Sequence, residues 1–242
     1  MVNFIVLIIL HLLGDFYLQT SKIAKCKNAR KNVACNKCTK CKENSKFNVK
    51  YLVLHILLYS IPFLVLFFMT NWFEAIKNIL IIAVSHSMID LFSCFLNKKF
   101  KQTLVLIGDQ ILHIGILFFA YKTTTFYPTF DGYIFASKTI LTVLLLMVPC
   151  SIFISKLFED LYCDNVYNGI FDIGSIIGIL ERFLVIIFAL FKNFAAIAII
   201  ITVKTWARTD DLKEPNFRNK YLLGTLASLV LALFCYILFE II

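Results

Sequence analysis

Long apolar runs alternate with short polar segments along this chain, and the pattern predicts membrane-spanning helices. The apolar runs lie at residues 2–20, 51–70, 78–96, 104–121, 137–157, 172–191, 193–207 and 220–242. Several of them approach the roughly 20 residues that an α-helix needs to cross the hydrocarbon core of a bilayer. Because lipid cannot satisfy exposed backbone polar groups, we expect an all-α, polytopic transmembrane bundle of about eight helices.

The composition agrees with a multi-pass membrane protein. Hydrophobic residues make up 60% of the chain and charged residues 16%, against about 45–50% and about 25% in soluble domains. We expect a first transmembrane helix in residues 1–21, a basic loop in residues 22–50 and the rest of the bundle in residues 51–242. The first run has no basic segment before it and contains His11 and Asp15, which favours a retained helix over a cleaved signal peptide.

Basic residues are concentrated between the first two apolar runs, where only Glu43 opposes them. They are Lys22, Lys25, Lys27, Arg30, Lys31, Lys37, Lys40, Lys42, Lys46 and Lys50. Cytoplasmic loops of membrane proteins carry such an excess, so we expect this loop in the cytoplasm and the N-terminus outside the cell membrane. The formal net charge of +9 therefore reflects membrane topology and contact with the bilayer, and we expect no nucleic-acid partner.

All four histidines lie inside predicted spans, and three of them have an aspartate four residues away. Side chains at this spacing share one helix face, about 6 Å apart along the axis, which is a chelating arrangement. The three pairs are His11 with Asp15, His86 with Asp90, and Asp109 with His113, while His55 lies in the second span.

The order within each pair predicts two polar layers. The first and third spans run inward and read His then Asp, whereas the fourth runs outward and reads Asp then His. At about 1.5 Å per residue, the three aspartates lie roughly 7–9 Å from the cytoplasmic ends of the spans. Their histidines lie roughly 13–15 Å deep, and His55 about 6–7 Å deep. Four helices therefore offer polar side chains at matched depth.

Carboxylates at this depth need a partner, because each one costs about 2.5–3.5 kcal/mol at a helix centre. They are expected to be protonated, paired with a cation such as Arg182, or bound to metal. Mixed imidazole and carboxylate ligands suit Zn, Mn or Fe, and the seven residues suffice for two ions. Asp15, Asp90 and Asp109 are then the candidate catalytic residues, with one carboxylate as the base for a metal-activated water. Interhelical hydrogen bonding or a proton relay are the alternatives.

Four cysteines in the basic loop predict a second metal site. Cys26, Cys35, Cys38 and Cys41 follow the spacing C-x8-C-x2-C-x2-C. Four thiols match the ligand count of a structural zinc site, and the neighbouring lysines favour thiolate. The reducing cytoplasm disfavours disulfides. An iron–sulfur cluster and free or redox-active thiols are the alternatives; the usual fourth cysteine and following proline of a ferredoxin run are missing.

Further polar residues lie within or beside the spans. Lys204 and Arg208 are candidates for interface anchors or for a clamp on a lipid headgroup. Gly174 and Gly178 form a G-x-x-x-G pattern, which favours close helix packing. The remaining candidates are Gln19, Gln110, Glu181 and Arg182. No P-loop, GxSxG or dinucleotide-binding fingerprint is present in the sequence.

The motifs together resemble a family of uncharacterised bacterial integral membrane proteins, catalogued as a domain of unknown function. The likeness rests on His11-Leu-Leu-Gly-Asp15-Phe-Tyr-Leu-Gln19, His86-Ser-Met-Ile-Asp90 and Asp109-Gln110-Ile-Leu-His113. A more distant likeness, in membrane His and Asp motifs, is to predicted membrane-bound metal-dependent hydrolases. The four-cysteine loop departs from the family pattern, in which the first loop is usually shorter.

Three functions follow as hypotheses. The first is an intramembrane metal-dependent hydrolase that acts from the cytoplasmic side on a lipid or membrane-peptide substrate. The second is an ion- or proton-coupled transporter, which needs a water-accessible path to both faces. The third is a non-catalytic scaffold or sensor whose cysteine loop recruits a partner.

Overall fold

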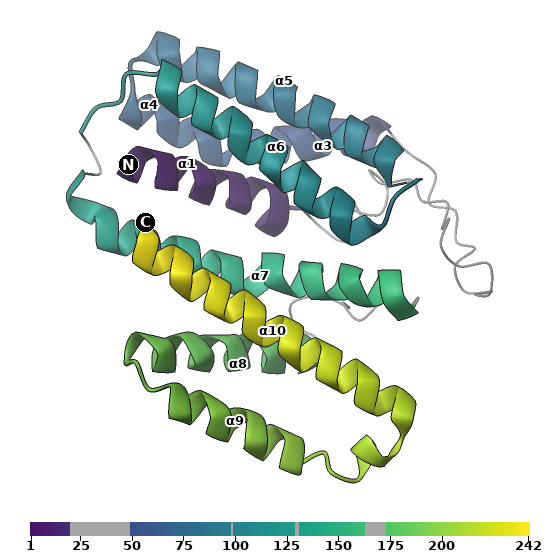
Figure 1. Cartoon of the computed structure of the whole chain (residues 1–242). Helices are drawn as coiled ribbons and strands as arrows, with labels where there is room; N and C mark the ends of the chain where they lie inside the picture. The colour runs from purple at the N-terminus through teal and green to yellow at the C-terminus, as the bar shows by residue number, and fades with distance from the viewer. Residues whose placement is uncertain (20–48, 98, 129–130, 163–172) are drawn as a thin grey trace. The chain divides into compact units, whose positions relative to one another are not determined.

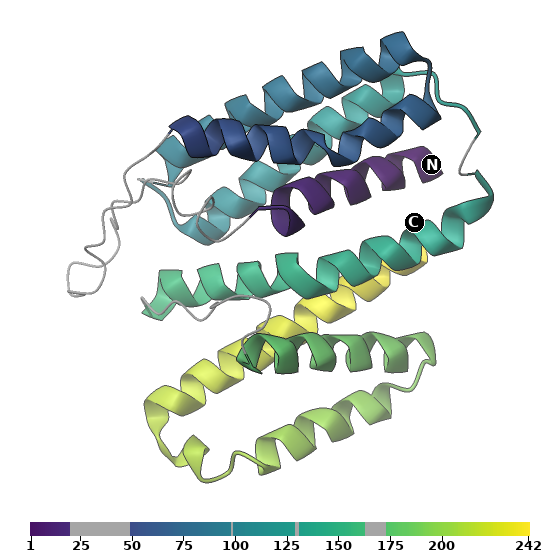
Figure 2. The same ribbon diagram turned by 180° about the vertical axis from the view of Figure 1, so that it is seen from behind.

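The computed structural model describes residues 1–19, 49–97, 99–128, 131–162 and 173–242, and in this part every regular element is helical (Figures 1 and 2). Among these described residues, six helices are long and apolar enough to cross a membrane: Lys50–Met69, Trp72–Leu96, Gln102–Thr123, Ile134–Tyr162, Ile173–Leu190 and Pro215–Ile241. The expectation of an all-α membrane protein is confirmed at this level.

Helix length alone does not set the number of spans. Two further apolar helices, Val2–Tyr17 and Phe194–Trp206, lie in predicted spans but are shorter than the other six. The total of about eight spans and the position of the N-terminus therefore stay predictions. The division at residues 21 and 50 also stays a prediction, because residues 20–48 lie outside the described residues.

The chain divides into two compact units, and the first comprises residues 1–141 and 159–163. Its helices run side by side in Figures 1 and 2. They are α1 (Val2–Leu12), the π-helical turn η1 (Leu13–Tyr17), α3 (Val49–Ser60), η3 (Pro62–Val65), α4 (Leu66–Met69), α5 (Trp72–Leu96), α6 (Gln102–Thr123), η4 (Asp131–Tyr133) and the two ends of α7 (Ile134–Tyr162).

The helix α5 reverses the pattern of a helix in a water-soluble protein. Its buried face carries Asn78, Ile82, His86, Asp90 and Ser93. Its exposed face carries, at intervals of four residues, the apolar side chains of Leu80, Val84 and Met88. A helix that hides its polar face and exposes its apolar face is suited to lipid as solvent, and it directs its polar side chains toward the other helices.

The apolar core of the first unit is built around α1. This helix buries eight of its eleven residues, including His11. Val6 and Leu10 pack with Tyr59 and Phe63 in one apolar cluster. Because α1 is surrounded by its neighbours, its C-terminal end is held close to α3, α5 and α6.

The second unit comprises residues 142–158 and 164–242. It contains the middle of α7, then α8 (Ile173–Leu190), α9 (Phe194–Trp206), η5 (Asp211–Lys213) and α10 (Pro215–Ile241). A tight turn joins α8 to α9, with Lys192 in the left-handed region at φ 55° and the Asn193 side chain capping α9. The core of this unit includes Leu146, Ala189 and Ala232.

Candidate metal centre

The end of α1 places Asp15 at a wide, π-helical turn. Turns of this type are rare and frequently occur at functional sites. Gly14, in the same turn, makes the position of Asp15 possible: a Cβ there would lie 2.8 Å from both the backbone oxygen and Cδ2 of Tyr59. Only glycine allows the two backbones to approach this closely. The contact brings Asp15 against α3, which carries His55.

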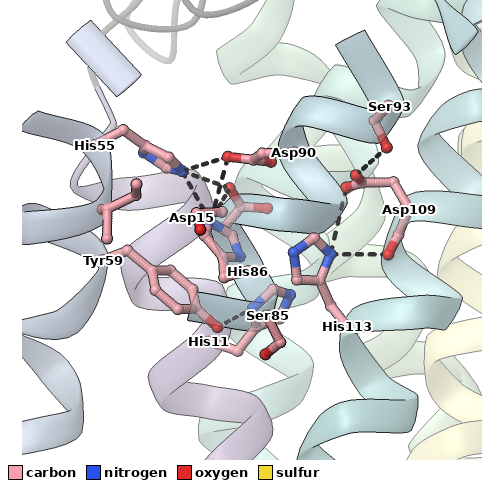
Figure 3. A network of polar contacts seen from close by, with 12 residues as sticks. His11, Asp15, His55, Tyr59, Ser85, His86, Asp90, Ser93, Asp109 and His113 are labelled. Atoms are coloured by element: carbon pink, nitrogen blue, oxygen red, sulfur yellow. Dashed lines mark hydrogen bonds and ion pairs between the residues drawn. The ribbon is translucent and has the colours of Figure 1, made fainter. Parts of the chain in front are cut away.

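A first group of candidate ligands combines Asp15 and His55 with His86 and Asp90 of α5. His55 Nε2 lies 3.4 Å from Asp15 Oδ1, 3.3 Å from Asp90 Oδ2 and 3.0 Å from His86 Nε2. His86 Nε2 lies 3.5 Å from Asp90 Oδ2 and 3.9 Å from Asp15 Oδ1. Figure 3 shows these side chains converging from three segments of the chain.

The separations within this group fit a tetrahedral ion. Ligand bonds of about 2.0–2.1 Å set the four ligand atoms of such an ion about 3.3–3.4 Å apart. The five separations given above run from 3.0 to 3.9 Å. One carboxylate oxygen from each aspartate and Nε2 from each histidine therefore form a cradle of the right size for Zn²⁺ or a similar cation.

Hydrogen bonding explains the close approach of these four atoms less well than a bound cation does. His55 Nε2 has three polar neighbours within 3.4 Å, contributed by His86, Asp15 and Asp90. A ring nitrogen carries one proton at most and can donate one good hydrogen bond. A cation placed among the four atoms satisfies all of them at once.

A second group contains Asp90, Asp109 and His113, so that Asp90 belongs to both groups. His113 Nδ1 lies 2.8 Å from the Asp109 backbone oxygen, which can only accept; Nδ1 therefore carries the proton. His113 Nε2 is buried, with no hydrogen-bond partner among the described residues. A backbone hydrogen bond that fixes the tautomer and leaves the other nitrogen available is typical of a metal-ligating histidine.

Asp109 is held by two further side chains. The Ser93 hydroxyl donates to Asp109 Oδ1 at 2.5 Å. The Gln110 amide donates to Asp109 Oδ2 and to Asp15 Oδ2, each at 3.2 Å. These donors orient the two carboxylates and connect the two groups, so that they form one continuous polar cluster, here called the His–Asp cluster.

His11 lies beside the two groups and belongs to neither. Its ring is 5.1 Å from the His113 ring and 6.1 Å from the His86 ring, which agrees with the predicted layer of three histidines. Its Nδ1 is 3.0 Å from the Tyr59 hydroxyl, and its Nε2 is 3.2 Å from Gln110 Oε1. Since Gln110 Oε1 only accepts, Nε2 donates to it and Nδ1 accepts from Tyr59. Hydrogen bonds therefore occupy both ring nitrogens of His11.

Sequence reasoning missed Tyr59 and Ser93. Tyr59 is buried and stacks on His86, with ring centroids 3.6 Å apart and planes 4° apart. It follows His55 by four residues, the same spacing that identified the His–Asp pairs, so its position was detectable. Ser93 follows Asp90 by three residues, which also places both on one helix face.

A largely apolar pocket of about 390 Å³ reaches the His–Asp cluster from between α5 and α6. Asp109 and Ser93 form its polar end, and its apolar walls include the exposed side chains of Phe92, Leu104 and Ile111. Nothing lies within 4 Å of a Cβ built at Gly108, which also lines it. The pocket therefore joins the polar cluster to a surface suited to lipid.

None of the remaining predicted residues that the structure describes belongs to either ligand group. Cys26, Cys35, Cys38 and Cys41 are outside the described residues, and Gln19 is the last residue described before them. In the second unit, Glu181 accepts from Lys204 Nζ at 2.6 Å. The hydrogen bonds of Arg182 go to α7, and Arg208 Nη1 lies 3.7 Å from Asp211 Oδ2 at the surface.

Comparison with known proteins identifies the family but adds no activity. No match was found among curated proteins or among solved structures. A family model described as "Protein of unknown function (DUF3307)" matches residues 3–38 and 32–144. The two segments together span residues 3–144, which is more than half of the 242 residues and includes the whole His–Asp cluster. The chain therefore belongs to the DUF3307 family.

Proposed function

We propose that this protein is an intramembrane metal-dependent hydrolase that binds one or two divalent ions, Zn, Mn or Fe, in the His–Asp cluster. The observation that carries the proposal is the spacing of the first ligand group, in which five separations of 3.0–3.9 Å lie around the edge of about 3.3–3.4 Å in a tetrahedral site. The second group shares Asp90 and would hold the second ion. Asp15, Asp90 and Asp109 are the catalytic carboxylates of this proposal.

The chemistry divides between the ion and the chain. A bound ion of this type activates water and polarises the oxygen of an ester or amide. Hydrolysis breaks that bond with addition of water, so a base must accept the water proton and an acid must return one to the leaving group. With a single ion in the first ligand group, Asp109 is not a ligand and is suited to this role, because it lies at the end of the pocket and Ser93 fixes the carboxylate.

The pocket supports a lipid or membrane-peptide substrate. Its walls are apolar and exposed, and its polar end is the catalytic carboxylate. An acyl chain or an apolar peptide side chain fits this environment, with the scissile group at Asp109. In the orientation that we propose, with about eight spans and the N-terminus outside, the carboxylates lie nearer the cytoplasmic face of the cell membrane.

One observation favours an ion- or proton-coupled transporter as the second candidate. Tyr59, His11, Gln110 and Asp109 form a continuous chain of hydrogen-bonding groups through the first unit. Histidine and aspartate side chains in such a network occur in the proton relays of pumps and transporters, and the Gln110 amide would orient them without itself passing a proton. A transporter moves protons or ions in liposomes without hydrolysing lipid, which separates the two candidates.

Metal content of the purified full-length protein, measured by elemental mass spectrometry, tests the proposal. Asp90→Asn preserves shape and removes the carboxylate common to both groups; Asp210→Asn is the matched control, because Asp210 is 93% exposed. A third variant replaces Cys26, Cys35, Cys38 and Cys41 with serine, which tests our proposal of structural zinc in the loop.

We expect the Asp90 variant to lose metal that the cysteine variant and the control retain, and hydrolysis of lipid esters to disappear with it. If the Asp90 variant keeps the full metal content of the wild type, the intramembrane metal site is wrong. If metal is present but no lipid ester or membrane peptide is hydrolysed, we would measure ion flux in liposomes. Flux that depends on the protein would support the transporter.

A further inference from the structure

The second unit buries one positive charge that its hydrogen bonds do not neutralise. Arg182 lies near the middle of α8 and is 2% exposed. A charged side chain within a membrane span is costly, by about 2.5–3.5 kcal/mol or more at the helix centre, and it is usually functional. Its surroundings therefore need an explanation of their own.

Neutral acceptors hold the guanidinium in place. Nε donates to the Leu146 backbone oxygen at 2.8 Å, and Nη2 donates to the Ser151 hydroxyl at 2.6 Å. Both acceptors are in α7 beside Pro149, which has no N–H and interrupts the regular backbone hydrogen bonds of the helix. These contacts fix the orientation of Arg182 and leave its charge uncompensated.

The carboxylate nearest in sequence is already paired. Glu181 accepts from Lys204 Nζ of α9 at 2.6 Å. Among the described residues no carboxylate lies within 4.0 Å of the Arg182 guanidinium. Glu181, Arg182 and Lys204 together therefore carry a formal charge of +1.

These three side chains line a small pocket, together with Thr225 and Ser228 of α10. Its other walls are the apolar side chains of Val185, Ile200, Ile201 and Leu229. The G-x-x-x-G pattern has a local role here: a Cβ at Gly178 would lie 3.3 Å from Arg182 Nη1 and within 4 Å of no neighbouring helix. The glycine therefore leaves room for the guanidinium rather than for close helix packing. Apolar walls strengthen the attraction between this charge and an anion.

We propose that this pocket, whose volume of about 20 Å³ admits oxygens of a phosphate rather than the whole group, binds the oxygens of a phosphate that is supplied by an anionic lipid or by free phosphate. Nε and Nη2 of the guanidinium donate to α7, so Nη1 is the nitrogen that can donate to phosphate oxygens. The Lys204 ammonium adds charge, and Thr225 and Ser228 add hydroxyl donors. A phosphodiester carries one negative charge and balances the +1 of the pocket. This site shares no residue with the His–Asp cluster and does not depend on its metal.

Binding to the full-length protein in detergent tests the site, with native mass spectrometry as the readout for lipids. The probes are phosphatidylglycerol and diacylglycerol of the same acyl chains, which lacks the phosphate. Inorganic phosphate is the third probe, followed by ³¹P NMR line broadening. Arg182→Gln removes the charge; Arg218→Gln is the matched control, because Arg218 is exposed on α10 and does not line the pocket.

We expect Arg182→Gln to weaken binding of the phosphate-bearing probe at least about tenfold, as for loss of a charged hydrogen bond, and Arg218→Gln to leave it unchanged. Preferential binding of phosphatidylglycerol over diacylglycerol assigns the site to a lipid; binding of inorganic phosphate alone assigns it to free phosphate. If Arg182→Gln binds every probe as the wild type does, or if diacylglycerol binds equally well, the proposal is wrong.

A second variant guards against a folding defect in Arg182→Gln. Ser228→Ala removes one pocket hydroxyl and changes little else. We expect about a threefold loss of phosphate binding, as for one neutral hydrogen bond. If Arg182→Gln does not fold, and folded Ser228→Ala binds phosphate as the wild type does, the proposal is also wrong.

Discussion

The two units of this protein bury opposite kinds of polar cluster in similarly apolar helices. The first unit gathers three carboxylates and four imidazoles at the meeting of α1, α3, α5 and α6. The second gathers a guanidinium and an ammonium against one carboxylate. Since isolated charges are unfavourable in a medium of low dielectric, the sign of each cluster indicates the class of ligand that it suits: a cation in the first unit and an anion in the second.

In both units, hydrogen bonds orient the charged groups without neutralising them. Ser93 and Gln110 donate to Asp109 in the first unit, whereas the Leu146 carbonyl and the Ser151 hydroxyl accept from Arg182 in the second. Fixed charged groups with their hydrogen-bonding partners already in place are what a preorganised ligand site requires. The comparison therefore yields separate tests for the two sites.

The largest expected effect is that a variant of each site loses the ligand of that site and keeps the ligand of the other. Asp90→Asn removes a ligand from both metal groups, so we expect its metal affinity to fall more than about 100-fold, beyond the loss typical of an outer-shell change. Arg182→Gln should retain the full metal content while losing phosphate binding. Elemental mass spectrometry and native mass spectrometry on the same preparations measure both quantities. Joint loss of both ligands in either variant would show that the sites are not independent.

The next largest effect concerns how the first unit is assembled. A methyl group added by Gly14→Ala would meet the Tyr59 backbone oxygen at 2.8 Å, so the end of α1 must move away from α3. We expect a loss of about 1–3 kcal/mol in unfolding free energy, typical of overpacking, and weaker metal binding. Thermal unfolding measures the change in stability, and metal titration measures the change in metal affinity.

The control for this variant is Gly115→Ala. A Cβ at Gly115 has nothing within 4 Å, and the residue lies in α6 of the same unit. We expect a neutral or slightly stabilising change there, because alanine favours helix. Equal behaviour of the two variants would mean that the close approach at Gly14 does not position Asp15.

Gly14 also marks the limit of what the sequence predicts. The long apolar runs located a helix in each predicted span. The four-residue spacing identified three aspartate–histidine pairs of the His–Asp cluster, and His55 was found by its position inside the second span. The depth calculation anticipated that His11, His86 and His113 would share one layer and that His55 would lie with the aspartates. These inferences depend on helix geometry, which is the same in every sequence.

Other features depend on tertiary contacts that carry no signature in the sequence. The π-helical turn at Asp15 results from the approach of α1 to α3, and the separation of His11 from the ligand groups results from its bonds to Tyr59 and Gln110. The partners of Arg182 are partly backbone oxygens of α7, which every residue has. Sequence reasoning considered an aspartate as the partner of Arg182 because it could compare only side chains.

A smaller effect is expected from the hydroxyl of Tyr59. Tyr59→Phe keeps the ring stacked on His86 and removes the hydrogen bond to His11 Nδ1. We expect the unfolding free energy to fall by about 1–3 kcal/mol, because a buried acceptor loses its donor. Metal content should remain at the wild-type level, since His11 belongs to neither ligand group. Loss of metal in this variant, measured as above, would place His11 among the ligands.

The smallest expected effect reverses the usual sign of a substitution in a binding pocket. Glu181→Gln removes the carboxylate that pairs with Lys204 and raises the formal charge of the pocket in the second unit from +1 to +2. Both partners of the pair are partly exposed, at 21% and 27%, so solvent screens their interaction to about 0–1 kcal/mol. We therefore expect phosphate binding to tighten by about threefold, or roughly 0.7 kcal/mol.

The isosteric Asp210→Asn, which also breaks a lysine pair but at the exposed surface, should leave binding unchanged. Because few defects of folding improve binding, a tighter complex in Glu181→Gln alone would identify net charge as the property that selects the ligand. Weaker binding would instead mean that Glu181 holds Lys204 in position, and that geometry outweighs charge in this pocket.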